Sequence, residues 1–197
     1  MLYPVNEIFF SVQAEGYWAG TPAIFVRLSG CNLSCPWCDT DHSKGVNMTP
    51  DEIMDQIEIA GGREVRRIVI TGGEPTIHDL WPLLRALFDG GYYIHIETNG
   101  TSPKLREYSA VAWITVSPKR EQPPVVDGGN ELKLIVDSKT TEEELKTWYN
   151  KGKFKYRYLQ PVFIPSIPMN IVGILKEMKV RPLWKLSVQY HKLIGIQ

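Results

Sequence analysis

The sequence predicts an α/β fold, an incomplete TIM-like barrel of parallel strands that forms one domain over residues 1–197. Short apolar, β-branched runs alternate with segments of helical spacing, which is typical of a parallel sheet covered by helices. No repeat, low-complexity tract or long linker interrupts this alternation. About six or seven strands are expected, and the 197 residues fall short of the roughly 250 of a complete eightfold barrel.

The first predicted strand is Ala23–Leu28, in which side chains alternate between two faces. A helix is expected from Pro50 to about Ile59. Thr49 and Glu52 have the spacing of a capping box, and proline is favoured at the first helical position.

The next strand is Arg67–Ile70, a short β-branched run that leads into two glycines. Leucines at helical spacing predict a helix over Asp79–Phe88, ended by Gly90 and Gly91. The remaining expected strands are Tyr92–Glu97, Val111–Val116, Leu132–Val136, Tyr156–Leu159 and Leu183–Val188, and the remaining helices are Thr141–Tyr149 and Ile171–Met178. The apolar tail, Leu193–Gln197, is expected to fold inward.

Distinctive polar segments directly follow the predicted strands. They are Cys31–Thr40, Thr71–Glu74, Glu97–Asn99, Ser117–Lys119 and Gln160. In a parallel barrel the carboxyl ends of the strands meet at one face, where active sites lie. We therefore expect these segments to form one site.

Composition excludes several classes of protein. Lys and Arg balance Asp and Glu to a formal net charge of +0, which does not favour a nucleic-acid binder. No apolar stretch is long enough to span a bilayer, and the N-terminus lacks the basic region of a secretory signal. A soluble, cytoplasmic protein without membrane or nucleic-acid partners is expected.

The three cysteines, Cys31, Cys35 and Cys38, lie within one short segment, and this odd number does not suit a disulfide framework. Three thiolates can bind three irons of a four-iron cluster and leave the fourth iron open to a reacting molecule. The alternative is a structural zinc site completed by His42.

The segment Gly30–Cys38 resembles the cluster loop of radical S-adenosylmethionine (radical SAM) enzymes. The resemblance implies a radical SAM core, with a [4Fe-4S] cluster whose open iron is chelated by S-adenosylmethionine. It also implies cleavage of that sulfonium to a 5′-deoxyadenosyl radical, so that the cofactor supplies the difficult chemistry.

Further segments spread over the chain resemble the 7-carboxy-7-deazaguanine synthase family. They are residues 7–16, 22–28, 38–40, 71–75, 96–98, 116–119, 159–161 and 189–192. The family is similar in needing Mg²⁺ and in using S-adenosylmethionine catalytically. The resemblance implies conversion of 6-carboxy-5,6,7,8-tetrahydropterin to 7-carboxy-7-deazaguanine with loss of ammonia, a carbon–nitrogen lyase reaction of queuosine-type 7-deazapurine biosynthesis.

Arg27 lies on a strand with apolar neighbours, so its guanidinium is expected to point into the barrel, where a bidentate fork suits a carboxylate. A buried structural ion pair is the alternative. The resemblance implies a pterin site made by Val12, Gln13, Ala14, Glu15, Arg27, Thr71, His191 and Gln197. Ala14 replaces the glycine that is usual in the family.

The resemblance assigns the Thr40 hydroxyl to Mg²⁺, which prefers oxygen ligands, although Thr40 alone would indicate a turn or helix cap. It places Gly73, Glu97, Ser117, Pro118, Lys119 and Gln160 at S-adenosylmethionine. Without it, Lys119 would be a solvated lysine. The histidines His78 and His95 are expected to be core or surface residues.

Two alternatives remain open. One is a radical SAM activase that makes a glycyl radical on a partner protein, and the other is a non-catalytic zinc or iron–sulfur module. The enzyme interpretation also implies an electron donor such as a flavodoxin or ferredoxin, and family likeness alone suggests a homodimer.

Overall fold

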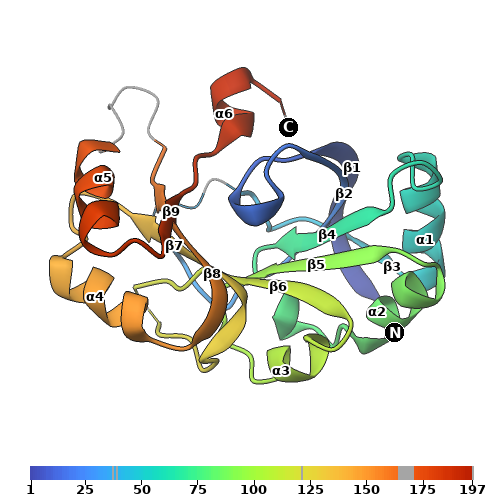
Figure 1. The fold of residues 1–197 in the computed structure, drawn as a ribbon. Coiled ribbons are helices and arrows are strands. Elements are labelled where there is room, and N and C mark those ends of the chain that lie inside the picture. Colours follow the sequence, from blue (N-terminus) through green and yellow to red (C-terminus); the bar gives the residue numbers. More distant parts are fainter. Residues whose placement is uncertain (37, 39, 121, 164–170, 197) are drawn as a thin grey trace.

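A nine-stranded sheet with the order β3-β1-β2-β4-β5-β6-β7-β8-β9 is the framework of the computed structural model, which describes residues 1–36, 38, 40–120, 122–163 and 171–196. Strand β2 and strands β4 to β9 run parallel, whereas β1 and β3 are antiparallel additions at one edge. Figure 1 shows that the sheet is curved, with α1 to α5 on its outer side. The predicted partial barrel is confirmed.

The strands are β1 (Tyr3–Gln13), β2 (Thr21–Leu28), β3 (Val46–Met48), β4 (Arg67–Gly72), β5 (Tyr93–Thr98), β6 (Ala112–Val116), β7 (Gly128–Val136), β8 (Lys153–Pro161) and β9 (Trp184–Leu186). The helices are α1 (Pro50–Ile59), α2 (Trp81–Asp89), α3 (Leu105–Tyr108), α4 (Glu142–Asn150), α5 (Ile171–Val180) and α6 (Tyr190–Ile194), with 3₁₀ turns η1 (Gly16–Trp18) and η2 (Pro75–Ile77).

Successive side chains along each strand point alternately into the apolar core and into the interior of the barrel. Ile68, Ile70, Ile94 and Ile96 belong to the apolar core, which also contains Leu83, Leu84 and Leu87 of α2. The intervening positions carry His95, Glu97, Thr115, Glu131 and Lys133, so the concave face of the sheet is unusually polar.

Strand β1 is the main element that the sequence prediction lacks. Its pairing with β2 shifts register between Val5 and Glu7, a bulge that breaks the period of two on which strand prediction depends. The helix predicted from Asp79 begins instead at Trp81, where Pro82 stands in the first turn, in which no amide hydrogen is needed.

Helix α1 has the predicted start. Glu52 N donates to Thr49 Oγ1 at 3.2 Å, and Thr49 N donates to the Glu52 carboxylate at 2.7 Å, which completes the capping box.

The C-terminal segment lies over the open end of the barrel, as Figure 1 shows for α6. Tyr190 N donates to Ala14 O at 3.3 Å, which ties α6 to the end of β1. The prediction that the tail folds inward is wrong for Leu193, Ile194 and Ile196, which are exposed, although Ile196 also borders the central cavity. Within the described part of the chain, no helix combines the length and apolarity that crossing a bilayer requires.

Candidate active site

A cavity of about 510 Å³ lies at the carboxyl ends of the parallel strands, a volume typical of sites for small organic ligands. Its lining includes Val12, Gln13, Ala14, Glu15, Arg27, Cys31, Cys35, Cys38, Thr40, Thr71, Gly73, Glu97, Ser117, Lys119, Gln160 and His191. Of the other predicted site residues, Pro118 lines a neighbouring cavity of about 260 Å³, and Gln197 lies outside the described residues. The other predicted site residues are thus brought together around one cavity.

The cysteine loop is tied to the segment after β4 by backbone hydrogen bonds. Gly73 N donates to Leu28 O at 3.1 Å, and Glu74 N donates to Gly30 O at 2.9 Å. A Cβ atom on Gly73 would lie 2.1 Å from Gly30 O and 2.9 Å from Cys31 Cβ, so only glycine permits this approach. All three cysteines carry thiols rather than disulfides and line the same cavity.

Zinc coordination requires ligands gathered around one point. Among the described side chains, no group of three or more Cys, His, Asp and Glu is placed to hold a single metal ion. The alternative site at Cys31, Cys35, Cys38 and His42 is therefore not formed in this structure. Three thiols on one wall of a larger cavity suit a cluster, in which each thiolate binds a different iron.

Glu74 organises the neighbouring loops, a role that sequence reasoning missed. Its carboxylate is 1% exposed and accepts hydrogen bonds from Thr76 N at 3.0 Å, Thr98 Oγ1 at 2.7 Å and Asn99 N at 2.6 Å. Asn99 Nδ2 in turn donates to Asn32 Oδ1 at 3.0 Å, inside the cysteine loop. One buried anion thus connects the ends of β4 and β5 with the cysteines.

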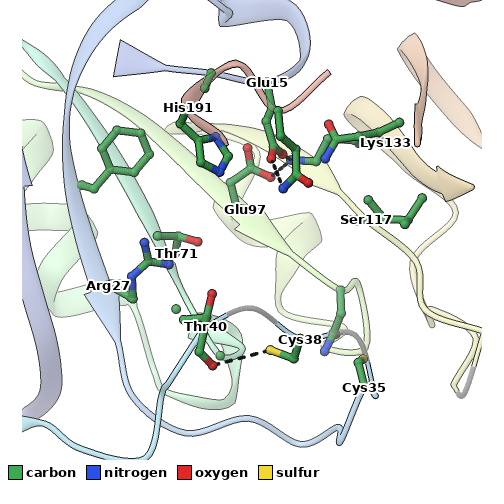
Figure 2. Close-up of a pocket in the computed structure, with 18 of the residues that line it drawn as sticks. Glu15, Arg27, Cys35, Cys38, Thr40, Thr71, Glu97, Ser117, Lys133 and His191 are labelled. Atoms are coloured by element: carbon green, nitrogen blue, oxygen red, sulfur yellow. Dashed lines mark hydrogen bonds and ion pairs between the residues drawn. The ribbon is translucent and has the colours of Figure 1, made fainter. Parts of the chain in front are cut away.

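Arg27 lines the cavity beside Thr71, its register partner on β4 (Figure 2). Its Nε atom donates to Glu7 Oε1 at 2.6 Å, and the Arg27 side chain is 20% exposed. The geometry contains elements of both predicted alternatives, because an ion pair is present and the guanidinium also borders the cavity.

On the opposite side of the cavity, Lys133 lies between two carboxylates (Figure 2). Its Nζ atom is 2.5 Å from Glu15 Oε2 and 2.8 Å from Glu97 Oε2. Lys133 is absent from the predicted site, because a single lysine in an apolar strand gives no motif. One feature of the sequence does point to Lys133. It follows Glu131 by two residues, so the two charged side chains are expected on the same face of one strand.

Burial opposes ionisation of Glu15, but the Lys133 ammonium and hydrogen bonds from Lys133, Gln160 and Gln189 outweigh it and lower the pKa of Glu15 to about 2. Burial also lowers the pKa of Lys133, yet the surrounding carboxylates, above all Glu15 and Glu97, raise it well above its ordinary value. Both groups are therefore charged at neutral pH.

Three of the residues predicted for the cofactor, Ser117, Lys119 and Gln160, line the same cavity at the ends of β6 and β8. Lys119 Nζ donates to Ser117 Oγ at 2.7 Å, and Gln160 Oε1 accepts from Ser187 Oγ at 2.8 Å. Lys119 is partly buried rather than solvated. Burial is the main cause that lowers the pKa of Lys119, and the positive charge of the nearby Lys133 lowers it further. The cavity is therefore bordered here by hydroxyl, amide and ammonium groups.

Both unassigned histidines have structural contacts. His95 is 1% exposed, and its Nε2 atom lies 2.8 Å from Thr115 Oγ1. Burial lowers the pKa of His95 to about 4, so it is neutral at pH 7. His78 Nε2 lies 3.0 Å from Ser29 O, just before the cysteine loop.

Glu131 lies deeper in the barrel, beneath the 3₁₀ turn η1. Its carboxylate is 1% exposed and accepts from Tyr17 N at 3.1 Å. Gly16 has a φ of +66°, which favours glycine, and a Cβ atom there would lie 1.9 Å from Glu131 Oε1, so the Glu131 side chain would have to shift. Burial, followed by repulsion from Glu97, raises the pKa of Glu131 to about 7.

Glu131→Gln is expected to stabilise the protein at pH 8 and to have little effect near pH 4.5. The folded pKa of Glu131 lies above the unfolded value, so its contribution to stability is complete below pH 4.5 and is lost as the pH rises through about 7. The gain at pH 8 is at most about 3 kcal/mol, and each kcal/mol corresponds to roughly 2–4 °C in Tm. Thermal unfolding at both pH values measures it, with exposed Glu58→Gln as control. Equal Tm differences at the two pH values would contradict the prediction.

Comparisons with known proteins agree with this geometry. The family model of the Radical SAM superfamily matches residues 25–122. The chain is 39% identical over 215 residues to the 7-carboxy-7-deazaguanine synthase of Burkholderia multivorans and 36% identical over 197 residues to that of Bacteroides thetaiotaomicron, with 100% of each chain covered. The crystal structure of QueE from Escherichia coli superposes with a TM-score of 0.76 at 32% identity, over 96% of this chain and 94% of that one.

Proposed function

Because the chain belongs to the 7-carboxy-7-deazaguanine synthase family of radical SAM enzymes, we propose that it converts 6-carboxy-5,6,7,8-tetrahydropterin to 7-carboxy-7-deazaguanine with loss of ammonia. The observation that carries this proposal is one cavity bordered by three cysteines, by the glycines after β4 and by Arg27, opposite the Glu15–Lys133–Glu97 group. Such a cavity can hold a cluster, a cofactor and a carboxylated heterocycle in contact.

The pterin is held between two oppositely charged walls. Arg27 binds the substrate carboxylate, and Thr71 lies beside it. Glu15 and the backbone of Val12, Gln13 and Ala14 face the edge of the ring that carries amine and amide hydrogens. His191 and Gln197 complete this proposed substrate site.

Cys31, Cys35 and Cys38 hold the [4Fe-4S] cluster, and Gly73, Glu97, Ser117, Pro118, Lys119 and Gln160 bind S-adenosylmethionine. When bound, these groups would supply the radical chemistry that the reaction requires. The residues of the chain orient the two ligands. Cleft walls of fixed hydrogen-bonding groups suit this role, because reacting atoms must lie within a few ångströms of each other.

Thr40 is proposed to bind Mg²⁺ through its hydroxyl oxygen. It lines the cavity near the cysteines, and Cys38 Sγ lies 3.6 Å from its carbonyl oxygen (Figure 2). Mg²⁺ prefers oxygen ligands and keeps few protein contacts, so a single threonine hydroxyl would suit it as a protein ligand.

We further propose that residues 1–197 act as a single radical SAM domain, as a homodimer in the cytoplasm, and receive electrons from a donor such as a flavodoxin or ferredoxin. The resemblance to the family supports these points. No nucleic-acid or membrane partner is invoked, in keeping with the balanced charge.

Mass spectrometry of an anaerobic reaction tests the function. The protein, reconstituted with iron and sulfide, is incubated with S-adenosylmethionine, Mg²⁺, a strong reductant and 6-carboxytetrahydropterin. Product that has lost ammonia, with S-adenosylmethionine not consumed in proportion, supports the proposal. Cleavage of S-adenosylmethionine without this product directs attention to the activase alternative, and the absence of both overturns the proposed pocket.

His42→Ala is expected to leave iron and sulfide content unchanged, because the cluster needs only the three cysteines. The zinc-module alternative requires His42 as the fourth ligand and predicts loss of metal. Metal analysis after anaerobic reconstitution distinguishes the two, with Cys38→Ala as the matched control that loses its metal on either hypothesis, iron on the first and zinc on the second.

A further inference from the structure

We propose that Lys133 is a positioning residue that fixes the carboxylates of Glu15 and Glu97 toward the cavity and thereby links the pterin and S-adenosylmethionine subsites, an inference that rests on the proposed function. Glu15 belongs to the proposed substrate wall and Glu97 to the proposed cofactor wall. Lys133 has no role in the reaction outlined above and is not in the set of residues predicted from the sequence.

The contacts form a closed arrangement. Lys133 Nζ holds the Oε2 atom of each carboxylate, at 2.5 Å for Glu15 and 2.8 Å for Glu97. The Oε1 atoms are held by amides, because Gln189 Nε2 donates to Glu15 at 3.0 Å and Gln13 Nε2 donates to Glu97 at 3.2 Å. Both carboxylates are therefore oriented at both oxygens, and Lys133 is the contact that they share.

Burial makes this contact specific. Lys133 is 5% exposed on the concave face of β7, where it cannot exchange its carboxylate partners for bulk water. A buried ammonium needs compensating charge, and two carboxylates supply more than it requires. The group therefore carries surplus negative charge, which favours ligand edges that donate hydrogen bonds.

Removing Lys133 leaves Glu15 facing Glu97 and Glu131, with Lys119 as the nearby cation and His95 behind Glu97. Burial and repulsion then favour protonation of one carboxyl group. A protonated carboxyl presents a hydrogen where the ligand needs an acceptor. We therefore expect a new dependence of ligand binding on pH.

The test uses the full chain with its reconstituted cluster and measures equilibrium binding of 6-carboxytetrahydropterin and of S-adenosylmethionine separately, from pH 5 to 8. Lys133→Met is expected to weaken both ligands by about tenfold or more, as the loss of charge-assisted hydrogen bonds implies. The affinity of Lys133→Met should also rise with pH more steeply than that of the wild type, in which Glu131 is the neighbouring group whose pKa lies in this range. Unchanged affinity for both ligands would overturn the proposal.

Matched variants separate positioning from a general structural effect. Glu15→Gln should weaken only the pterin and Glu97→Gln only S-adenosylmethionine. Lys133→Met combined with Glu15→Gln should bind the pterin no more weakly than Glu15→Gln alone, because Lys133 acts through Glu15. Additive losses without any dependence on pH would show a structural role and overturn the proposal.

Lys133→Arg tests the positioning role of Lys133 if Lys133→Met does not fold. This variant keeps the charge but alters its geometry, so both ligands should bind more weakly while the pH profile of the wild type is retained. Affinities equal to those of the wild type would overturn the proposal. Failure of the wild type to bind the pterin would instead overturn the proposed function, so the two failures are distinguishable.

Discussion

Arg27→Lys is expected to raise the KM for 6-carboxytetrahydropterin by roughly tenfold to a hundredfold, the effect of losing one charge-assisted bidentate contact. Lysine preserves the charge but offers a point contact instead of a planar fork. The ammonium of a lysine at this position can face either Glu7 or the substrate carboxylate. The guanidinium of Arg27 can face both, because it engages Glu7 through its Nε atom, at 2.6 Å. Steady-state kinetics of the reconstituted enzyme measure the change.

Two comparisons isolate the proposed contact with the substrate. Glu7→Gln removes the ion-pair partner but retains the guanidinium, so its KM should change by less than about threefold, as for a partly exposed pair. A tetrahydropterin without the carboxylate should bind wild type and Arg27→Lys equally. If Glu7→Gln reproduces the defect of Arg27→Lys, Arg27 is a structural ion-pair residue.

The position of the site could be predicted from the sequence because parallel strands bring their carboxyl ends together. Thr71, Glu97 and Gln160 come from separate strands, yet each lies at the end of its strand and lines one cavity. Only the order of strands and polar segments was needed for this inference. The roles of individual residues came from family resemblance and stay predictions.

The interior of the barrel could not be predicted in the same way. Glu131 and Lys133 interrupt an apolar strand, and such alternation ordinarily indicates an outer face in water. Here the polar face lines the buried interior of a partial barrel, where Glu15 and Glu97 from other elements neutralise Lys133. Those partners lie 118 and 36 residues away along the chain, a separation that local patterns do not report.

The same limit applies to β1 and to Glu74. The bulge between Val5 and Glu7 hides the strand from a test of periodicity. Glu74 reads as part of a glycine-rich turn, and its partners Thr98 and Asn99 belong to the following strand and loop. Its importance becomes visible only when the ends of β4 and β5 are adjacent.

Glu74→Gln is expected to destabilise the protein by about 1–3 kcal/mol, the cost of a buried polar group left without its partner. The carboxylate oxygens accept hydrogen bonds from Thr98 Oγ1 at 2.7 Å and Asn99 N at 2.6 Å, and from Thr76. An amide retains one acceptor oxygen but turns an NH₂ group toward a donor at the other position. At roughly 2–4 °C per kcal/mol, the Tm should fall by several degrees.

Glu52→Gln is the matched control, because it makes the same change at an exposed carboxylate that also accepts a backbone hydrogen bond. Its effect on Tm should be small. Glu74→Gln should also lower iron incorporation, since Asn99 connects Glu74 to Asn32 of the cysteine loop at 3.0 Å. Thermal unfolding of the apoprotein and iron analysis after reconstitution measure the two consequences separately. A normal Tm with normal iron content would show that the buried network does not support the cluster loop, and the role assigned to Glu74 would then be wrong.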